Sequence, residues 1–226
     1  MKALIKRAFS AIGLGVYRLD NSSFDGPKKP VVASPIHHNS KAGLEEFYSD
    51  AETVESYLDP AFYDRLIDLL ASHGVDYQQK HVVDVGCGTG GLLKALQNRF
   101  QPRSLTGFEY SDKALELARV KVPGVEFCYF DIYEGIPRQF DVIFCVEVLE
   151  HLLHPDRALR NVLAMLDHSG VALVTVPNGR TDTFDGHINF WSPESWEVFL
   201  KQMCREHKIE TGLTENTQNN YAVIKR

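Results

Sequence analysis

Residues 82–91 read Val82-Val83-Asp84-Val85-Gly86-Cys87-Gly88-Thr89-Gly90-Gly91, and this stretch decides the fold of the chain. A short β-branched run ends in a glycine-rich turn, and the periodic apolar run that follows at residues 92–96 predicts a helix. At the start of such a helix, unpaired N–H groups and the positive end of the helix dipole converge on one spot. The glycines leave room for a ligand against the backbone. Asp84, at the strand end, can orient the turn or accept a hydrogen bond. The stretch therefore predicts a cofactor-binding turn.

The segments after this turn alternate between short apolar runs and helical patterns, which is typical of a parallel sheet covered by helices. Two of the expected strands end beside acids, because Glu109 follows residues 104–108 and Asp131 follows residues 125–130. An acid at the first of these positions can accept hydrogen bonds from both hydroxyls of a ribose. Further strands are expected at 140–146 and 170–176, and 208–213 is expected to pair with 221–225 as a terminal hairpin. The pattern predicts an α/β, doubly wound, seven-stranded sheet.

Helices are expected before the first strand and between the later ones. Start signals are Asp59-Pro60, Ser111 and Ser192-Pro193, each of which can satisfy free amides in a first helical turn. The expected helices cover residues 44–58, 60–72, 112–120, 154–166 and 193–203.

A second group of chemistry-bearing residues, Glu147-Val148-Leu149-Glu150-His151, comes directly after the strand at 140–146. In a helical turn, positions 147, 150 and 151 share one face, which would point over the strand ends. Two carboxylates and an imidazole crowded there would repel one another or lose hydration without a partner, and a cation is one such partner. The alternative is that Glu and His side chains are hydrogen-bonded into the fold.

The string Asp84-x-Gly86-x-Gly88-x-Gly90 resembles the first motif of class I S-adenosylmethionine (SAM) dependent methyltransferases, and the element order from about residue 43 is similar to theirs. The resemblance implies a cytoplasmic methyltransferase (EC 2.1.1.-) with a Rossmann-like fold and SAM as its cofactor. It also implies that Asp131 accepts from the adenine amino group, that Ile132 packs on the ring, and that Tyr48 and Tyr57 cover the site. The alternatives are that Asp131 caps its own turn and that the two tyrosines are core residues. The implied cofactor-binding residues are Asp84, Gly86, Cys87, Gly88, Gly90, Glu109, Tyr110, Asp131, Ile132, Val146 and Glu147.

The motif Glu147-x-x-Glu150-His151, together with His187, resembles the ubiquinone-biosynthesis O-methyltransferases and the small-RNA 3′-terminal 2′-O-methyltransferases. In those families two glutamates and two histidines hold a metal against a vicinal diol. The resemblance therefore implies a metal site of Glu147, Glu150, His151 and His187, with Glu150, His151 and His187 catalytic and a hydroxyl as acceptor. Such a mixed N/O set suits Mn²⁺, Fe²⁺, Co²⁺ or Zn²⁺ better than Mg²⁺. Without a metal, His151 or His187 would act as the general base.

Two other interpretations compete with a methyltransferase. Gly86, Gly88 and Gly91 also satisfy the dinucleotide pattern G-x-G-x-x-G, and Glu109 follows at about the distance expected of its acid, so an NAD-binding oxidoreductase is one alternative. The other is a SAM-binding domain without catalysis that acts as an interaction module.

The composition limits the classes of protein and of methyl acceptor that fit this chain. At 226 residues and 44% hydrophobic content, one domain of ordinary size is expected, with residues 43–226 as the catalytic domain and 1–42 as an amphipathic helix and flexible arm. A formal net charge of -6 argues against a nucleic-acid substrate, as does the lack of an arginine-rich string between Pro177 and His187. The four cysteines have no C-x-x-C spacing, which favours reduced thiols in the cytoplasm. The expected acceptor is a small molecule or a lipid- or sugar-linked hydroxyl, such as a quinone precursor.

The first helix, at residues 1–17, is basic and amphipathic, with Leu4, Ile5, Ala8, Phe9 and Ile12 on one face. It is expected either to rest on a membrane surface or to pack on its own domain or a second subunit. A peripheral contact with a membrane would suit a lipid-linked acceptor.

We expect the intact chain to float with anionic liposomes at low salt and a chain lacking residues 1–20 to stay in the soluble fraction. The attraction comes from Lys2, Lys6 and Arg7, so it should fade at high salt as screening sets in. Liposome flotation measures it. If the intact and truncated chains both stay soluble at low salt, the helix is a packing element.

Overall fold

The structure, a computed structural model, describes residues 38–50, 54 and 59–226. The helix expected at 1–17, most of the expected arm and Tyr57 lie outside the described residues. In the part that is described, no helix combines the length and the apolar character needed to cross a membrane. All four cysteines are unpaired, and three of them are buried.

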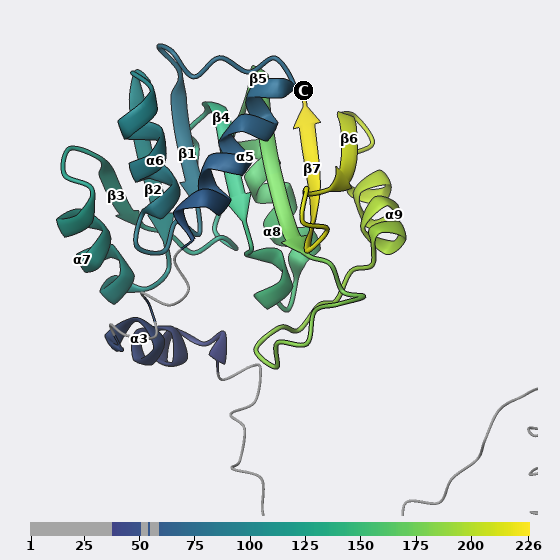
Figure 1. Ribbon diagram of the computed structural model, residues 1–226, viewed down its shortest axis with the longest axis horizontal. Helices are drawn as coiled ribbons and strands as arrows, with labels where there is room; N and C mark the ends of the chain where they lie inside the picture. The colour runs from purple at the N-terminus through teal and green to yellow at the C-terminus, as the bar shows by residue number, and fades with distance from the viewer. Residues whose placement is uncertain (1–37, 51–53, 55–58) are drawn as a thin grey trace, which may run out of the picture. The chain divides into compact units, whose positions relative to one another are not determined.

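In the described part of the chain, seven strands form one sheet in the order β3-β2-β1-β4-β5-β7-β6 (Figure 1). The first five strands run parallel, whereas β7 runs antiparallel to both of its neighbours. This topology confirms the predicted α/β seven-stranded sheet with its reversed terminal pair. The strands are β1 His81–Val85, β2 Ser104–Glu109, β3 Glu126–Tyr129, β4 Phe140–Val146, β5 Leu166–Pro177, β6 Lys208–Leu213 and β7 Asn219–Lys225.

Helices cover both faces of the sheet, as expected of a doubly wound fold (Figure 1). Residues of α5, α6 and α7 pack with Val82 and Phe144 on one face, whereas α8 and α9 pack with Val83 and Ile143 on the other. Successive strand residues point to opposite faces, so the central strands are apolar on both. The helices are α3 Lys41–Ser49, α5 Pro60–Ser72, α6 Gly91–Arg99, α7 Asp112–Lys121, the 3₁₀ helix η1 Leu149–His151, α8 Pro155–Ala164 and α9 Pro193–Met203.

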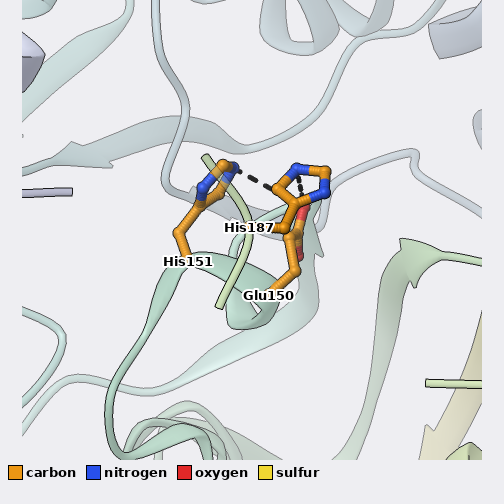
Figure 2. A group of neighbouring side chains, drawn as sticks. All are labelled: Glu150, His151 and His187. Carbon is orange, nitrogen blue, oxygen red and sulfur yellow. Dashed lines mark ion pairs between the residues drawn. The ribbon is translucent and has the colours of Figure 1, made fainter. Parts of the chain in front are cut away.

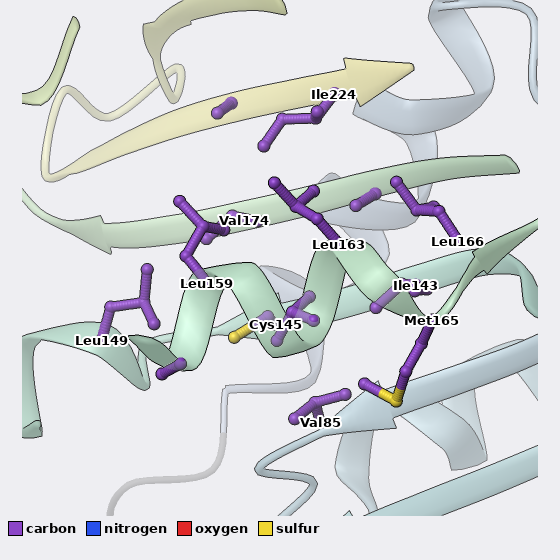
Figure 3. Close-up of a cluster of buried hydrophobic side chains, with 14 of the residues drawn as sticks. Val85, Ile143, Cys145, Leu149, Leu159, Leu163, Met165, Leu166, Val174 and Ile224 are labelled. Atoms are coloured by element: carbon purple, nitrogen blue, oxygen red, sulfur yellow. The ribbon is translucent and has the colours of Figure 1, made fainter. Parts of the chain in front are cut away.

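The core beneath α8 is closely packed. Figure 3 shows Leu159 and Leu163 of this helix against Cys145, Val174 and Ile224 of the sheet. Complete burial of a leucine side chain stabilises a fold by about 1.5–3 kcal/mol. The core beneath α8 is therefore apolar, and buried acids such as Asp84 and Glu109 lie where strands end.

The three predicted helix-start signals are confirmed. In each case a side-chain oxygen accepts a hydrogen bond from a backbone amide of the first helical turn, which would otherwise lack a partner. The pairs are Asp59 with the Ala61 amide at 3.0 Å, Ser111 with the Ala114 amide at 3.1 Å and Ser192 with the Ser195 amide at 3.3 Å.

Two expected boundaries are wrong. The helix expected from residue 44 begins at Lys41 and ends at Ser49, because the Ser40 hydroxyl accepts from the Gly43 amide and starts it earlier. The helix expected to reach residue 166 ends at Ala164, and β5 begins at Leu166 rather than 170. A shift in register between β4 and β5 lets this extra segment pair with the start of β4.

The helix α3 is fixed to the start of α7 by its acidic side chain Glu45. Its two carboxylate oxygens accept hydrogen bonds from the amides of Asp112 and Lys113, at 2.7 and 3.0 Å. The Lys41 ammonium group lies 2.8 Å from the Asp112 carboxylate and strengthens the contact. A carboxylate placed on free amides at a helix N-terminus is favourable both as an acceptor and as a negative charge at the positive end of the dipole.

We expect Glu45→Ala to destabilise the protein by about 1 kcal/mol and to loosen α3, because two helix-start amides lose their acceptor. Thermal unfolding and hydrogen exchange at the Asp112 and Lys113 amides measure these effects. Glu116→Ala is the control, since it removes only an exposed ion pair with Lys113 on α7, the helix to which Glu45 binds. Unchanged exchange at both amides in the Glu45 variant would contradict the docking role.

Candidate active site

A cavity of about 790 Å³ lies at the edge of the sheet where β1, β2 and β4 end. Every residue that the sequence predicted for the cofactor lines this cavity, with the exception of Gly90. Glu150, His151 and His187 line it as well. The structure thus brings the two predicted groups, from the glycine turn and from the Glu-x-x-Glu-His motif, to one place.

The glycine turn is shaped to receive a ligand. Its first amides, from Gly86 and Cys87, donate to the Phe108 carbonyl of β2 at 2.8 and 3.0 Å, which fixes the turn to the sheet. Gly88 adopts φ 50°, in the left-handed region that favours glycine, and a Cβ there would lie 3.0 Å from the Tyr48 hydroxyl. Tyr48 therefore lies over the turn, as expected of a residue that covers the site.

Glu109, at the end of β2, ties the two neighbouring turns together. One carboxylate oxygen accepts from the Gly88 amide at 2.9 Å, and the other accepts from the Tyr110 and Ser111 amides at 2.7 and 2.9 Å. Burial raises the pKa of this carboxyl group, and the three backbone donors oppose the shift. A carboxylate has about four acceptor positions, so about one remains for a ligand hydroxyl beside Gly88.

The two residues expected at the adenine lie after β3. One oxygen of Asp131 accepts from the Tyr133 amide at 2.9 Å, so this side chain caps its own turn while lining the cavity. Ile132 is buried and presents an apolar surface to the same space. Both positions are compatible with the predicted roles.

Asp84 is buried at the end of β1. Burial, and then the nearby charge of Glu109, raise the pKa of its carboxyl group to about 8. The shift favours the protonated form, which can donate a hydrogen bond as well as accept one.

Glu147 departs from the expected geometry. It adopts φ 53° and lies before the helical turn, which begins at Leu149, so the expectation that residues 147, 150 and 151 share one helical face is wrong. Its carboxylate instead accepts from the Thr175 hydroxyl and the Asn219 amide group, each at 2.8 Å. Burial raises the pKa of Glu147 to about 7, and these two donors limit the rise.

Glu150, His151 and His187 form a compact group with one ligand atom from each lying within 4.8 Å of the others (Figure 2). The Nε2 atoms of His151 and His187 lie 3.8 and 4.0 Å from the same Glu150 oxygen. The three could together hold a metal ion; the predicted fourth ligand, Glu147, lies outside this group.

The electrostatics of this group are unusual. Glu150 is fully buried, and among the described residues neither of its carboxylate oxygens has a hydrogen-bond partner. Burial, and then the charge of Glu147, raise the pKa of Glu150 well above its usual range. Burial, and then His187, lower the pKa of His151 to about 4, so its ring is neutral and can offer a lone pair to a metal.

The loop between β5 and α9 brings His187 to this group. The amides of Ile188 and Asn189 donate to the Glu150 carbonyl at 2.8 and 3.0 Å. The Asn189 side chain also donates to the carbonyls of Leu149 and Leu152, at 3.1 and 2.7 Å. The loop is therefore fastened to the backbone of η1 and to Leu152, which follows it.

Some residues of the site were not predicted. His38 and Tyr63 line the cavity, and Asp182 contacts His187. Asp182 also borders a second, open hollow of about 910 Å³, which shares Phe184 with the first. No spacing rule could have found these residues, because they come from the arm, a cap helix and a loop.

Comparison with known proteins identifies the family. A family described as "Methyltransferase domain" matches residues 55–203. Trans-aconitate 2-methyltransferase of Acidovorax sp. (strain JS42) is 32% identical over 131 residues, covering 53% of this chain and 50% of that protein. The chain thus spans about half the length of this relative. Ubiquinone biosynthesis O-methyltransferase of Neisseria meningitidis serogroup C (strain 053442) is 30% identical over 171 residues, covering 66% of this chain and 71% of that protein.

A solved structure shares the fold. Magnesium protoporphyrin IX methyltransferase from Synechocystis PCC 6803, with bound SAM, superposes with a TM-score of 0.63 at 15% identity, covering 88% of this chain and all of that chain. The family match favours SAM over the dinucleotide that Gly86, Gly88 and Gly91 also allowed. With the seven-stranded order 3-2-1-4-5-7-6 and a glycine turn at the end of β1, the chain belongs to the methyltransferase-domain family and has the class I SAM-dependent fold.

Proposed function

We propose that the protein transfers the methyl group of SAM to a hydroxyl oxygen of its acceptor. The cavity supports SAM because the glycine turn, the Glu109 carboxylate and Ile132 line it together, and these groups suit the amino acid portion, the ribose and the adenine of this cofactor. In the reaction the acceptor oxygen attacks the methyl carbon, the carbon–sulfur bond breaks with its electrons going to sulfur, and the hydroxyl proton leaves. The protein mainly aligns the two reactants and accommodates that proton.

The observation that carries the hydroxyl chemistry is the unpaired, fully buried carboxyl group of Glu150. A buried charge without donors is costly, and a divalent cation offsets that cost. With the His151 and His187 imidazoles beside it, Glu150 completes a set of one oxygen and two nitrogen ligands, which suits Mn²⁺, Fe²⁺, Co²⁺ or Zn²⁺. When bound, such an ion lowers the pKa of a hydroxyl and orients its oxygen. Glu150, His151 and His187 would hold it.

The protein's own residues limit the alternative without a metal. A general base works best when its pKa lies near the working pH, so His151, with a pKa of about 4, is a weak base at neutral pH. His187, which lies 4.0 Å from the Glu150 carboxyl group, is then the better placed of the two histidines to act as base.

The walls of the site favour an uncharged acceptor with an apolar part. Among the described residues that line the two hollows, Lys41 is the one lysine or arginine, and it is paired with Asp112. Phe184 and Phe190 are exposed beside His187, with ring centroids 4.8 and 6.3 Å from the imidazole. These features suit a quinone precursor or a lipid- or sugar-linked hydroxyl, and they do not suit nucleic acid or a polycarboxylate such as trans-aconitate.

We expect Gly88→Val to abolish binding of S-adenosylhomocysteine, because a branched side chain would project from the turn toward the Tyr48 hydroxyl, into the space that the cofactor would occupy. Calorimetric titration measures this. Gly74→Val is the matched control: Gly74 is also left-handed, at φ 85°, but open space surrounds it, so both variants carry a backbone strain of about 1–2 kcal/mol. Retained affinity in a folded Gly88 variant would contradict the assignment of this turn to the cofactor.

We expect the purified protein to retain Mn²⁺ or Co²⁺ stoichiometrically and Glu150→Gln to lose it, because the neutral amide cannot balance the ion's charge. Elemental analysis and calorimetry with MnCl₂ measure this retention, and methyl transfer should stop in EDTA. Glu134→Gln, at an exposed turn, is the control, and S-adenosylhomocysteine titration verifies folding. Absence of metal in the active protein, with activity that survives EDTA, would leave a histidine, His151 or His187, as the base.

A further inference from the structure

The loop that carries His187 also carries an acid that holds its ring. One oxygen of Asp182 lies 2.6 Å from Nδ1 of His187, and both side chains are nearly buried, at 8% and 11% exposure. The other oxygen accepts a hydrogen bond from the Phe184 amide at 3.1 Å. Both oxygens of Asp182 are therefore engaged, one by the backbone and one by the imidazole.

The chemistry of the two groups decides which ring nitrogen is protonated. An ionised carboxylate only accepts hydrogen bonds, so its contact of 2.6 Å with Nδ1 is a hydrogen bond when the ring proton is on Nδ1. In a neutral imidazole the lone pair is then on Nε2. This atom faces the Glu150 oxygen at 4.0 Å, and the ring of His151 lies 4.7 Å away between centroids (Figure 2).

The contact with Asp182 is not needed to place the backbone of His187. The amides of Ile188 and Asn189 already fix this part of the loop to the Glu150 carbonyl. What remains free is rotation of the ring about its own axis and the choice of tautomer. Because Asp182 contacts Nδ1 of the ring, it can set both the rotation of the ring and its tautomer.

We propose that Asp182 is a positioning residue that holds His187 as the Nδ1–H tautomer, so that Nε2 is the atom of this ring that takes a proton or binds a cation. The role of Nε2 in taking a proton or binding a cation rests on the proposed function, whereas the assignment of the tautomer does not. An acid that accepts a hydrogen bond from one ring nitrogen of a functional histidine fixes the orientation of the ring. It also makes the other ring nitrogen a better donor of its lone pair.

The test is Asp182→Asn in the full chain. The Phe184 amide needs an oxygen as its partner, so the new side chain keeps its carbonyl there and turns its NH₂ group toward His187. An NH₂ group donates, so Nδ1 must become the acceptor and the proton must move to Nε2. Two-bond ¹H–¹⁵N spectra of histidine-labelled protein, at a pH where the ring is neutral, report this tautomer, and His187→Gln assigns the signal.

We expect Nδ1–H in the native protein and Nε2–H in the variant. Asp185→Asn is the matched control, because Asp185 is an exposed acid of the same loop and should leave the tautomer unchanged. Nε2–H in the native protein would overturn the proposal, as would an unchanged signal in an Asp182 variant that still binds S-adenosylhomocysteine. If the variant fails to fold, the native tautomer alone decides.

Titration with MnCl₂ separates this proposal from the proposed metal site. If the native protein binds Mn²⁺, Asp182→Asn should weaken the affinity about 10- to 100-fold, as the loss of an outer partner of a histidine ligand does. Equal affinity in the two proteins would overturn the role of Asp182 in presenting Nε2. If the native protein binds no Mn²⁺, the metal site fails, and the tautomer still decides the role of Asp182.

Discussion

The parallel pairing of β1 with β2 and β4 is the constraint on which the site depends. It sets Val85 beside Phe108 and Asp84 beside both Gly107 and Phe144, so that all three strands end at one edge. Because these strands are apolar and buried on both faces, polar side chains gather where the strands stop. The acids that follow them are thereby forced into one cavity, however far apart they are in the sequence.

These buried carboxyl groups differ in their hydrogen-bond partners. Glu109 is satisfied by three backbone amides, and Glu147 by a hydroxyl and a side-chain amide, whereas Glu150 has no hydrogen-bond partner among the described residues. All three pKa values are raised by burial, and at Glu109 and Glu147 donors to the charged form oppose the rise. A cation would therefore relieve the largest uncompensated cost at Glu150.

The sequence predicts the sheet well because its signals are local, whereas much of the site is not. Buried strands follow from β-branched runs, and the helix starts follow from Asp59, Ser111 and Ser192. The position of the Glu147 side chain could not be predicted, because a single residue with a positive φ leaves the hydrophobic pattern of the sequence unchanged. Asp182 was missed for another reason: its contact with His187 depends on how a long loop turns back upon itself, and no spacing rule encodes that path.

Glu150 has two tasks that cannot be separated. Its backbone carbonyl accepts the amides of Ile188 and Asn189, which fastens the loop, while its carboxyl group faces the space that His187 also borders. The loop and the carboxyl group therefore share one anchor, and His187 reaches Glu150 through folding rather than through binding of an acceptor. Asp182 then fixes the remaining freedom of the ring. When the groups around a reactant are in place before it binds, no rearrangement is needed during the reaction, and the proposed methyl transfer would benefit from this preorganisation.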